Sequence, residues 1–374
     1  MHIRTITEAG DLQGKRVILR GSFNVPVKDG VVQNAYRIVQ GLSTLKYLQA
    51  AGARTIVIGH IGREKDETLM PVLTELKKHL PIEWGGSITD EALRGKVDAL
   101  QNGEMLLIEN LRQDDRESDN DAEFAALIAS YGDIYVNDAF DNAHREHASM
   151  VGVPKLLPSY AGLNLAEELS SLERVMVPEQ PSLFIIGGAK FETKMPLVEK
   201  YLNIYDNVFV SGALMNDIFK AKGYEVGTSL VSDVSLAGAE FLEDSRLIIP
   251  IDIIVTGPRG VRTTVPQDVQ SDEAIMDSGP QTTELLATYI RAAKTVLWNG
   301  PFGNFEAGFE EGTVETVKHL ASSEAFSVIG GGDTVAAIEK LGLNDKLGFV
   351  STGGGAMLTY LEKGRTVAID CLKE

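Results

Sequence analysis

The chain is poor in cysteine and in positive charge, and it has no long apolar run. Cys371 is the only cysteine among 374 residues, which rules out a disulfide within the chain and fits a reducing compartment. No apolar run approaches the roughly 20 residues of a membrane span. Residues 1–10 lack the basic-then-apolar pattern of a secretion signal. We therefore expect a cytoplasmic protein that has no membrane partner.

Basic residues are outnumbered by acidic ones. The sequence has 35 Lys and Arg against 53 Asp and Glu, which gives a formal net charge of -18. A surface of that sign repels phosphate backbones and anionic headgroups. We expect no nucleic-acid partner, and a small phosphorylated ligand must bind where cations are concentrated locally.

Two familiar site patterns are also absent. The chain has no G-x-x-x-x-G-K-[ST] loop, so it has no P-loop nucleotide site. His60, His144 and His147 have no acidic or cysteine partner at a metal-ligand spacing, and all three could be hydrogen-bonded core residues. We expect His60 to contact an anion, because it shares a turn with Arg63, and the other two to be structural.

Short runs rich in Val, Ile and Leu alternate with longer helical patterns along the chain. This alternation predicts an α/β fold with parallel sheets covered by helices on both faces. Residues 37–48 have apolar side chains at helical spacing. The predicted strands are residues 16–22, 55–59, 105–109, 133–137, 182–186, 207–211, 247–255, 295–298, 327–329 and 348–351.

The length of the chain suggests two domains, each able to bury a core. Pro154 and Pro158 interrupt the pattern within residues 152–159, where we expect the seam. The charged and apolar alternation of residues 163–175 then predicts one helix that bridges the two bodies.

Residues 326–360 contain the same pattern twice: a short apolar run, three glycines and a helical segment. Glycine lets backbone N–H groups approach a phosphate, and a helix start adds partial positive charge. Asp333 directly follows the first glycine run, where a carboxylate could hold the metal of a nucleotide. A lone glycine cluster also fits a tight turn capped by Asp333. Two such clusters in succession favour phosphate binding.

Ligands of open α/β sheets bind beyond the carboxyl ends of the strands. In the first half of the chain these positions are repeatedly basic or amide. One arginine there is usually a surface ion pair. Several at one edge of an acidic protein predict an anion pocket. The residues concerned are Ser22, Asn24, Arg37, His60, Arg63, Asn110, Arg112, Asn137 and Arg145.

In the second half the same positions carry glycines, amides and lysines. Lys190 and Lys194 would lie on one side of a helix that begins there, where they suit phosphate contact. The alternative is a solvated basic face. Glu306 follows a glycine turn and could accept hydrogen bonds from a ribose, or it is ordinary surface. The two halves together predict a lobe for a small phosphorylated acid and a lobe for a nucleotide, and they suggest phosphoryl transfer across a cleft.

Nearly the whole chain resembles phosphoglycerate kinase, because the family's motifs occur here in order and at matching spacing. They are FNVP (23–26), HIGR (60–63), ENLR (109–112), YVNDAF (135–140), AHREHAS (143–149), GGAK (187–190), FKAKGYEVGTSL (219–230), WNGPFGNFE (298–306), GGGDT (330–334) and STGGGA (351–356). The resemblance implies two Rossmann-like lobes. Residues 1–160, with a tail from about 360 to 374, would bind phosphoglycerate, residues 161–176 would form the interdomain helix, and residues 177–359 would bind nucleotide.

The resemblance also implies which residues act. The phosphorylated acid would be bound by Ser22, Asn24, Arg37, His60, Arg63, Arg112 and Arg145. The nucleotide would be bound by Gly188, Ala189, Lys190, Lys194, Gly212, Asn299, Pro301, Glu306, Gly332, Asp333 and Thr334, with Asp333 on the Mg2+ of Mg-ADP or Mg-ATP. The catalytic residues would be Arg37, Lys194, Gly331 and Gly354.

The chain departs from the family pattern in places. The family usually reads VDFNVP where this chain reads GSFNVP, so Ser22 stands where a substrate-contacting carboxylate is expected. Gln113 replaces an aromatic residue, GGGM reads SGAL at residues 211–214, and residues 256–265 look shortened. We expect these changes to affect affinity and rate more than reaction type.

The activity implied by the resemblance is reversible transfer of the acyl phosphate of 1,3-bisphosphoglycerate to ADP, giving 3-phosphoglycerate and ATP, in glycolysis or gluconeogenesis. Transfer would be direct and in line, in a monomer whose lobes close by hinge bending. Two alternatives stay open. One is a non-catalytic nucleotide-binding relative, with Ser22 marking lost substrate selection, and the other is a kinase of a different phosphorylated acid.

Overall fold

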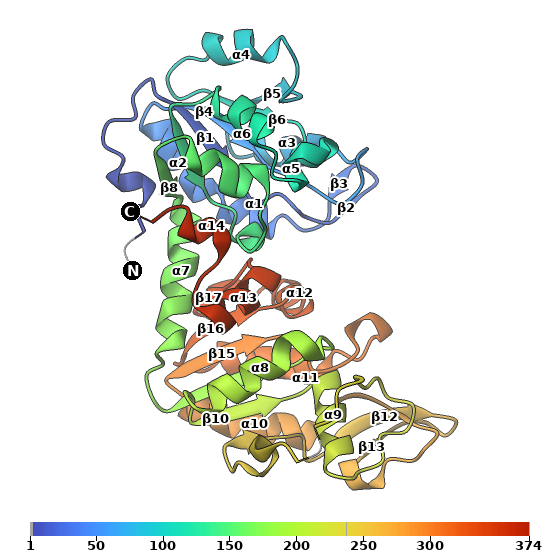
Figure 1. Cartoon of the computed structure of the whole chain (residues 1–374). Coiled ribbons are helices and arrows are strands. Elements are labelled where there is room, and N and C mark those ends of the chain that lie inside the picture. Colours follow the sequence, from blue (N-terminus) through green and yellow to red (C-terminus); the bar gives the residue numbers. More distant parts are fainter. Residues whose placement is uncertain (1–2, 237, 374) are drawn as a thin grey trace. The chain divides into compact units, whose positions relative to one another are not determined.

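The computed structural model describes residues 3–236 and 238–373, and the chain divides into two compact units. Unit 1 is Met1–Leu169 with Lys363–Glu374, and unit 2 is Ser170–Glu362 (Figure 1). The division falls within α7 (Leu163–Met176), which confirms the helix predicted over residues 163–175. Residues 152–159, where the sequence predicts a seam, lie within unit 1, and strand β8 (Ser159–Ala161) of that unit begins at their end.

Unit 1 is built on a six-stranded parallel sheet of order β5-β6-β4-β1-β7-β8. Its strands are β1 (Arg16–Arg20), β4 (Arg54–Ile58), β5 (Ile82–Gly86), β6 (Met105–Ile108), β7 (Ile134–Asn137) and β8 (Ser159–Ala161), and a small hairpin joins β2 (Val27–Lys28) to β3 (Val31–Val32). Its helices are α1 (Tyr36–Gln40), α2 (Leu42–Ala50), α3 (Met70–Leu76), α4 (Leu93–Ala99), α5 (Asp115–Ser118), α6 (Ala122–Ala129) and α14 (Val367–Asp370).

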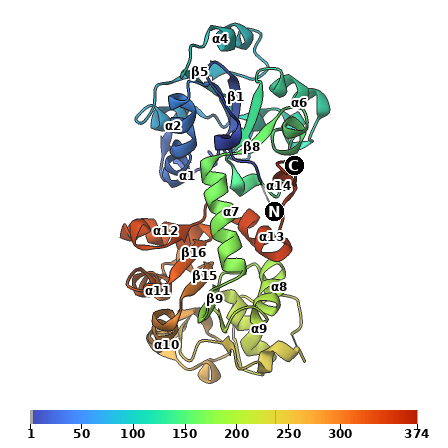
Figure 2. The ribbon, with the colours of Figure 1, turned by 90° about the vertical axis from the view of Figure 1, so that its left-hand side faces the viewer.

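The core of unit 1 explains why its strands are continuous apolar runs. Leu45 and Leu48 of α2 pack with Val17 and Leu19 of β1 and with Val57 of β4. Helices lie on both faces of the sheet, so both sets of strand side chains are buried (Figure 2). The C-terminal segment also belongs to this unit, since the Ala368 N–H donates to the Ala143 carbonyl at 3.1 Å.

Unit 2 is built on a second six-stranded parallel sheet, of order β11-β10-β9-β15-β16-β17, and an antiparallel sheet of order β13-β12-β14. The strands are β9 (Ser182–Ile186), β10 (Asn207–Val210), β11 (Leu247–Ile248), β12 (Ile253–Gly257), β13 (Gly260–Thr264), β14 (Ala274–Ser278), β15 (Thr295–Asn299), β16 (Phe326–Gly330) and β17 (Phe349–Val350). The helices are α8 (Phe191–Leu202), α9 (Ala213–Ala221), α10 (Pro280–Ala292), α11 (Glu311–Ala321), α12 (Gly332–Leu341) and α13 (Gly355–Lys363).

Two predicted elements are each divided in the structure. The single strand predicted over residues 247–255 is wrong, because it is divided into β11 and β12. Pro250 lacks the N–H that a ladder needs, and the Asp252 carboxylate instead accepts hydrogen bonds from the Gln281 and Thr282 N–H groups at the start of α10. The helix predicted over residues 37–48 is two helices, α1 and α2, which meet at Gly41.

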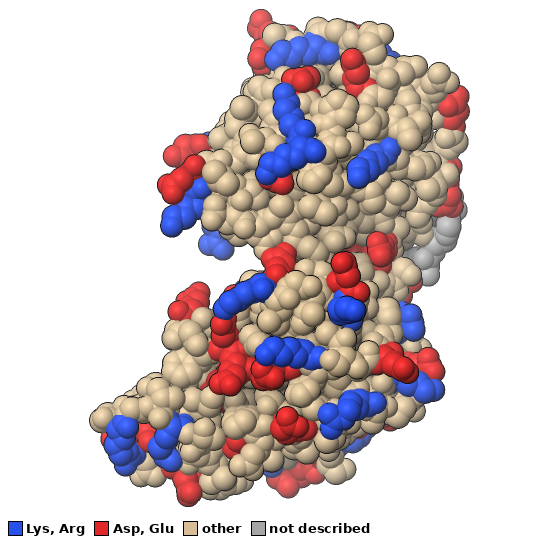
Figure 3. All heavy atoms as spheres, turned by 180° about the vertical axis from the view of Figure 1, so that it is seen from behind, with Lys and Arg blue, Asp and Glu red and all other residues tan. Residues whose placement is uncertain are grey.

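Charge is distributed without large patches of one sign on the face seen in Figure 3, where acidic and basic side chains are interspersed. None of the helices in the described ranges combines the length and apolar character needed to cross a bilayer.

Candidate functional site

Three loops at the carboxyl edge of the unit 1 sheet are held together by two amide side chains. Asn24 Oδ1 accepts a hydrogen bond from the Gly62 N–H at 3.0 Å, which joins the loop after β1 to the loop after β4. The Asn110 side chain, after β6, donates to the Ile61 and Glu67 carbonyls at 3.0 and 2.9 Å. These bonds fix the loops that carry the predicted basic residues.

A cavity of about 630 Å³ opens at this edge. It is lined by Asn24, Gly62, Arg63, Lys65, Arg112, Asp115, Ser118, Arg145 and His147. The structure thus brings together four residues that the sequence predicts for anion binding: Asn24, Arg63, Arg112 and Arg145. Burial, and then the charges of Arg145 and Arg20, lower the pKa of the Arg112 guanidinium. A bound anion would relieve this repulsion.

The remaining predicted residues of unit 1 lie around the cavity and not in its lining. His60 is 2% exposed, and its Nδ1 lies 2.8 Å from Arg20 Nη2. Burial and the Arg20 charge lower the pKa of His60 well below its usual value, so the ring is neutral and accepts from Arg20. Arg37 Nη1 donates to the Asn24 carbonyl at 2.5 Å. Ser22 is buried, and its Oγ has no hydrogen-bond partner.

Sequence reasoning missed a buried charged network beside this cavity. Arg20 Nε donates to Ser149 Oγ at 3.1 Å, and that hydroxyl donates to Glu117 Oε1 at 2.5 Å. Burial raises the pKa of the Glu117 carboxyl, although Arg20 and the hydrogen bonds from Ser149 oppose the rise. Arg20 could have been suspected, because it is a charged residue directly after the apolar run Val17–Leu19 of β1. His147 was predicted to be structural, yet it lines the cavity.

In unit 2, glycines surround the ammonium group of Lys194. This side chain is only 6% exposed, and its Nζ donates to the Gly187 carbonyl. Gly188 has φ of +85° and Gly300 has φ of +93°, and a Cβ added at either would lie 2.9 or 2.5 Å from that Nζ. Lys190 is exposed but Lys194 is buried, so the two lysines do not form the solvated basic face that was the alternative.

The glycine loops of unit 2 also contact one another closely. Gly212 has φ of +64°, and a Cβ added there would lie 2.2 Å from the Gly188 nitrogen. The Gly188 N–H donates to the Pro301 carbonyl at 2.9 Å. Glycine is therefore required where the loops after β9 and β10 meet. Asn299 is buried at the end of β15.

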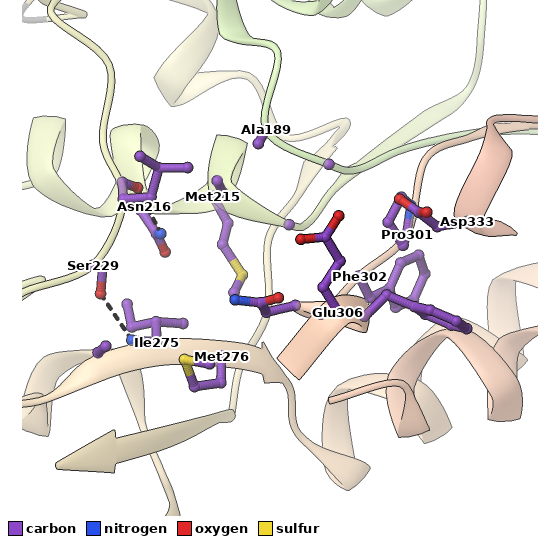
Figure 4. A pocket seen from close by; sticks show the side chains of 18 of the residues that line it. Ala189, Met215, Asn216, Ser229, Ile275, Met276, Pro301, Phe302, Glu306 and Asp333 are labelled. Atoms are coloured by element: carbon purple, nitrogen blue, oxygen red, sulfur yellow. Dashed lines mark hydrogen bonds between the residues drawn. The ribbon is translucent and has the colours of Figure 1, made fainter. Parts of the chain in front are cut away.

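A second cavity, of about 490 Å³, extends from these glycines to the antiparallel sheet. Ser229, Ile275, Met276, Met215 and Asn216 lie toward one end of it, Pro301 and Asp333 toward the other, and Glu306 lies between (Figure 4). The predicted residues that line it are Gly188, Ala189, Gly212, Pro301, Glu306 and Asp333, whereas Lys190, Lys194, Asn299, Gly332 and Thr334 do not. The apolar end suits a planar base, and the end rich in backbone N–H groups suits phosphates.

Sequence reasoning also missed the residues of the apolar end. Met215 of α9 packs against Ile253, Val255 and Ile275 of the antiparallel sheet. Asn216 is 2% exposed, its Nδ2 donates to the Leu230 carbonyl at 2.9 Å, and its Oδ1 has no partner. The signal was present in the sequence, because Asn216 is an amide within a run that is otherwise apolar on that helix face.

Both predicted glycine runs lead into helices. The first helix, α12, begins at Gly332 after Gly331, whose φ is +107°, and Asp333 lies in its first turn. The second, α13, begins at Gly355. Within the described ranges, no cluster of three or more His, Cys, Asp or Glu side chains could hold a metal ion. The single carboxylate of Asp333 fits Mg2+ that arrives with a nucleotide, since phosphate oxygens and water supply its other ligands.

Comparisons with known proteins agree with this geometry. Residues 6–364 match the model of the family described as phosphoglycerate kinase. The chain is 40% identical to the phosphoglycerate kinase of Thermus thermophilus, over 99% of this chain and 100% of that protein. It is 41% identical to the one from Rubrobacter xylanophilus, over 97% of each.

Solved structures are similar over the same span. The phosphoglycerate kinase of Coxiella burnetii superimposes with a TM-score of 0.83 and 34% identity, covering 99% of this chain and 98% of that one. The enzyme of Pyrococcus horikoshii OT3 gives a TM-score of 0.86 and 30% identity, with the same coverage. This chain therefore belongs to the phosphoglycerate kinase family.

Proposed function

We propose that this member of the family transfers the acyl phosphate of 1,3-bisphosphoglycerate to ADP, reversibly, with the phosphorylated acid in the unit 1 cavity and Mg-ADP in the unit 2 cavity. The observation that carries the proposal is the contrast between the two cavities. One is lined by three arginines at strand ends, and the other joins a glycine-lined end to an apolar end.

The phosphorylated acid would be held by charge in unit 1. Arg63, Arg112 and Arg145 face the cavity and can each donate two hydrogen bonds to a phosphate or carboxylate. Asn24 adds an amide, and His60 would act through Arg20. Ser22 supplies a hydroxyl where the family usually has a carboxylate, so we propose that Ser22 contributes little to substrate affinity.

The nucleotide would be held by shape and backbone groups in unit 2. Met215 and Ile275 would enclose the base, and Glu306 would accept from the ribose hydroxyls. The glycine loops that contain Gly188 and Gly212 would approach the phosphates. Asp333 would hold the Mg2+ of the nucleotide, which supplies charge neutralisation on the phosphate oxygens.

Transfer would need no covalent enzyme intermediate. The bond between phosphorus and the substrate's carboxyl oxygen breaks as a terminal oxygen of ADP bonds to phosphorus, and the carboxylate leaves without needing a proton. The chain's task is to align the two ligands and to neutralise the moving phosphoryl group. We assign neutralisation to Arg37 and Lys194, with N–H groups at the helix starts after Gly331 and Gly354.

Because the two ligands bind to separate units, we further propose that the units close by hinge bending around α7 to exclude water. We propose that the enzyme acts as a cytoplasmic monomer. Two alternatives, a non-catalytic relative and a kinase of another acid, are not favoured. The chain belongs to the family, and it has the arginines, Lys194 and Asp333.

A coupled assay tests the proposal: purified protein is mixed with ADP, Mg2+ and 1,3-bisphosphoglycerate, and ATP formation is followed. We expect rapid ATP formation that requires both substrates. Nucleotide binding without ATP formation would support the non-catalytic alternative. Turnover only with a different phosphorylated acid would support the second alternative.

A further inference from the structure

Two neighbouring segments of unit 1 carry buried polar atoms that have no hydrogen-bond partner. They lie at the carboxyl ends of β1 and β7 and in the loops that follow; the two strands are adjacent in the sheet, with Arg20 opposite Asn137. Among the described residues, these atoms are Ser22 Oγ, Asn137 Nδ2, Asp138 Oδ2, Asp141 Oδ1, Asn142 Nδ2 and His144 Nδ1. A buried polar group without a partner is costly, so such a group is explained where a ligand completes it.

Asp141 is the member of this group that is linked to the unit 1 cavity through Arg37 and Asn24, although it lies outside the lining of that cavity. Its side chain is 6% exposed, and its Oδ2 lies 4.0 Å from Arg37 Nη1. The same Arg37 nitrogen donates to the carbonyl of Asn24, which lines the unit 1 cavity. The carboxylate of Asp141 therefore lies beside Arg37, to which we assign neutralisation of the moving phosphoryl group.

The chemistry of a carboxylate restricts what Asp141 can bind. Its oxygens only accept hydrogen bonds, and they repel the phosphate and carboxylate of the substrate. At neutral pH a phosphorylated hydroxy acid has one strong donor, which is its hydroxyl group. Ser22 cannot supply a charged acceptor, although the family usually has a carboxylate at that position.

We propose that Asp141 accepts a hydrogen bond from the C2 hydroxyl of 3-phosphoglycerate, and that it supplies the carboxylate that position 22 lacks. Asp141 is then the residue that selects a hydroxy acid over the same phosphorylated acid without a hydroxyl. This inference rests on the proposed function. The competing explanation is that Asp141 only orients Arg37, in which case it affects all substrates equally.

The test compares 3-phosphoglycerate with 3-phosphooxypropanoate, which differs only in lacking the C2 hydroxyl. ADP release from Mg-ATP is measured for each, with hydroxylamine present to trap the acyl phosphate product. We expect the wild-type kcat/KM to favour 3-phosphoglycerate by about 10- to 100-fold, as a charge-assisted hydrogen bond allows. In Asp141→Ala the ratio of the two kcat/KM values should fall close to one.

Three further variants make the result decisive. Ser22→Asp in the Asp141→Ala background should restore the preference, because it returns a carboxylate to the neighbouring segment. Asp141→Asn keeps the shape and an uncharged acceptor, so it should retain a reduced preference even if Asp141→Ala folds poorly. Asp115→Ala is the matched control, because that carboxylate lines the same cavity but is exposed and paired with Lys65 at 2.6 Å. It should leave the preference unchanged.

The outcomes separate the two proposals. If the wild-type protein does not phosphorylate 3-phosphoglycerate, the proposed function fails. If it does, but Asp141→Ala and Asp141→Asn lower kcat/KM equally for both acids, Asp141 only orients Arg37 and the inference is overturned.

Discussion

The ammonium group of Lys194 donates a hydrogen bond to the backbone carbonyl of Gly187 and lies among glycines, away from solvent. A carbonyl gives this cation only partial compensation for its lost hydration. Burial, and then the charge of Lys190, lower its pKa to about 8. A nucleotide phosphate would be the missing anionic partner.

The lowered pKa of Lys194 predicts a falling limb in the pH profile. On the proposed role of Lys194 only its protonated form binds phosphate, so kcat/KM for the nucleotide should fall about tenfold for each pH unit above about 8. Lys194→Arg keeps the charge and should move this limb to higher pH, even if it lowers the maximum. Lys190→Arg, at an exposed position, should leave the limb in place. The same limb in both variants would assign it to another group.

Removing the side-chain charge of Arg37 or of Lys194 should slow turnover without unfolding the protein. We expect Arg37→Ala and Lys194→Ala each to lower kcat by about two to three powers of ten, as loss of one preorganised charge contact does. Lys318→Ala removes a surface cation that pairs with Glu315 at 2.6 Å and should keep wild-type activity. Steady-state kinetics and circular dichroism measure both properties. Near-wild-type turnover in either active-site variant would contradict its assigned role.

A third prediction concerns the close contact between Gly212 and Gly188. Gly212→Ala should weaken nucleotide binding and destabilise the protein, because its Cβ would lie 2.2 Å from the Gly188 nitrogen. Gly342→Ala is the matched control: Gly342 also has φ of +64°, but nothing lies within 4 Å of its added Cβ. Backbone strain alone costs roughly 1 kcal/mol.

Thermal unfolding and nucleotide titration of these two glycine variants give the comparison. Gly212→Ala should unfold at a clearly lower temperature than Gly342→Ala and bind ADP more weakly. Equal effects would mean that the loops after β9 and β10 can move apart at little cost.

The fold could be predicted where burial alone determines a strand. Ser182–Ile186 was predicted with its observed bounds because all five residues are buried. Strands β5 and β8, at the two edges of the unit 1 sheet, were missed. Strand β5 has two glycines and an irregular burial pattern, and strand β8 has only three residues. Pro250 was the overlooked signal in the strand wrongly predicted over residues 247–255.

The site could be predicted where it depends on strand ends. Arg63, Arg112 and Arg145 were identified because parallel strands place their carboxyl ends at one edge. The apolar end of the unit 2 cavity could not be identified this way. Met215 and Ile275 come from a helix face and an antiparallel sheet whose contact depends on tertiary packing. The sequence analysis did not single out Asp141, because its burial and its unpartnered oxygen follow from tertiary packing.

Hinge closure predicts a change in size that depends on both ligands. Small-angle X-ray scattering should show a smaller radius of gyration with Mg-ADP and 3-phosphoglycerate together than with either alone. Closure would expel water before transfer and is expected to need both ligands. An unchanged radius without ligand, with either ligand alone and with both together would contradict the hinge proposal.

The central claim is that the phosphoryl group passes directly from one ligand to the other. The measurement that tests it most directly is the stereochemical course of transfer, with 1,3-bisphosphoglycerate made chiral by oxygen isotopes at the transferred phosphorus. Direct in-line transfer predicts inversion of configuration in the ATP that is formed. Retention would require a phosphoenzyme intermediate and would contradict the account.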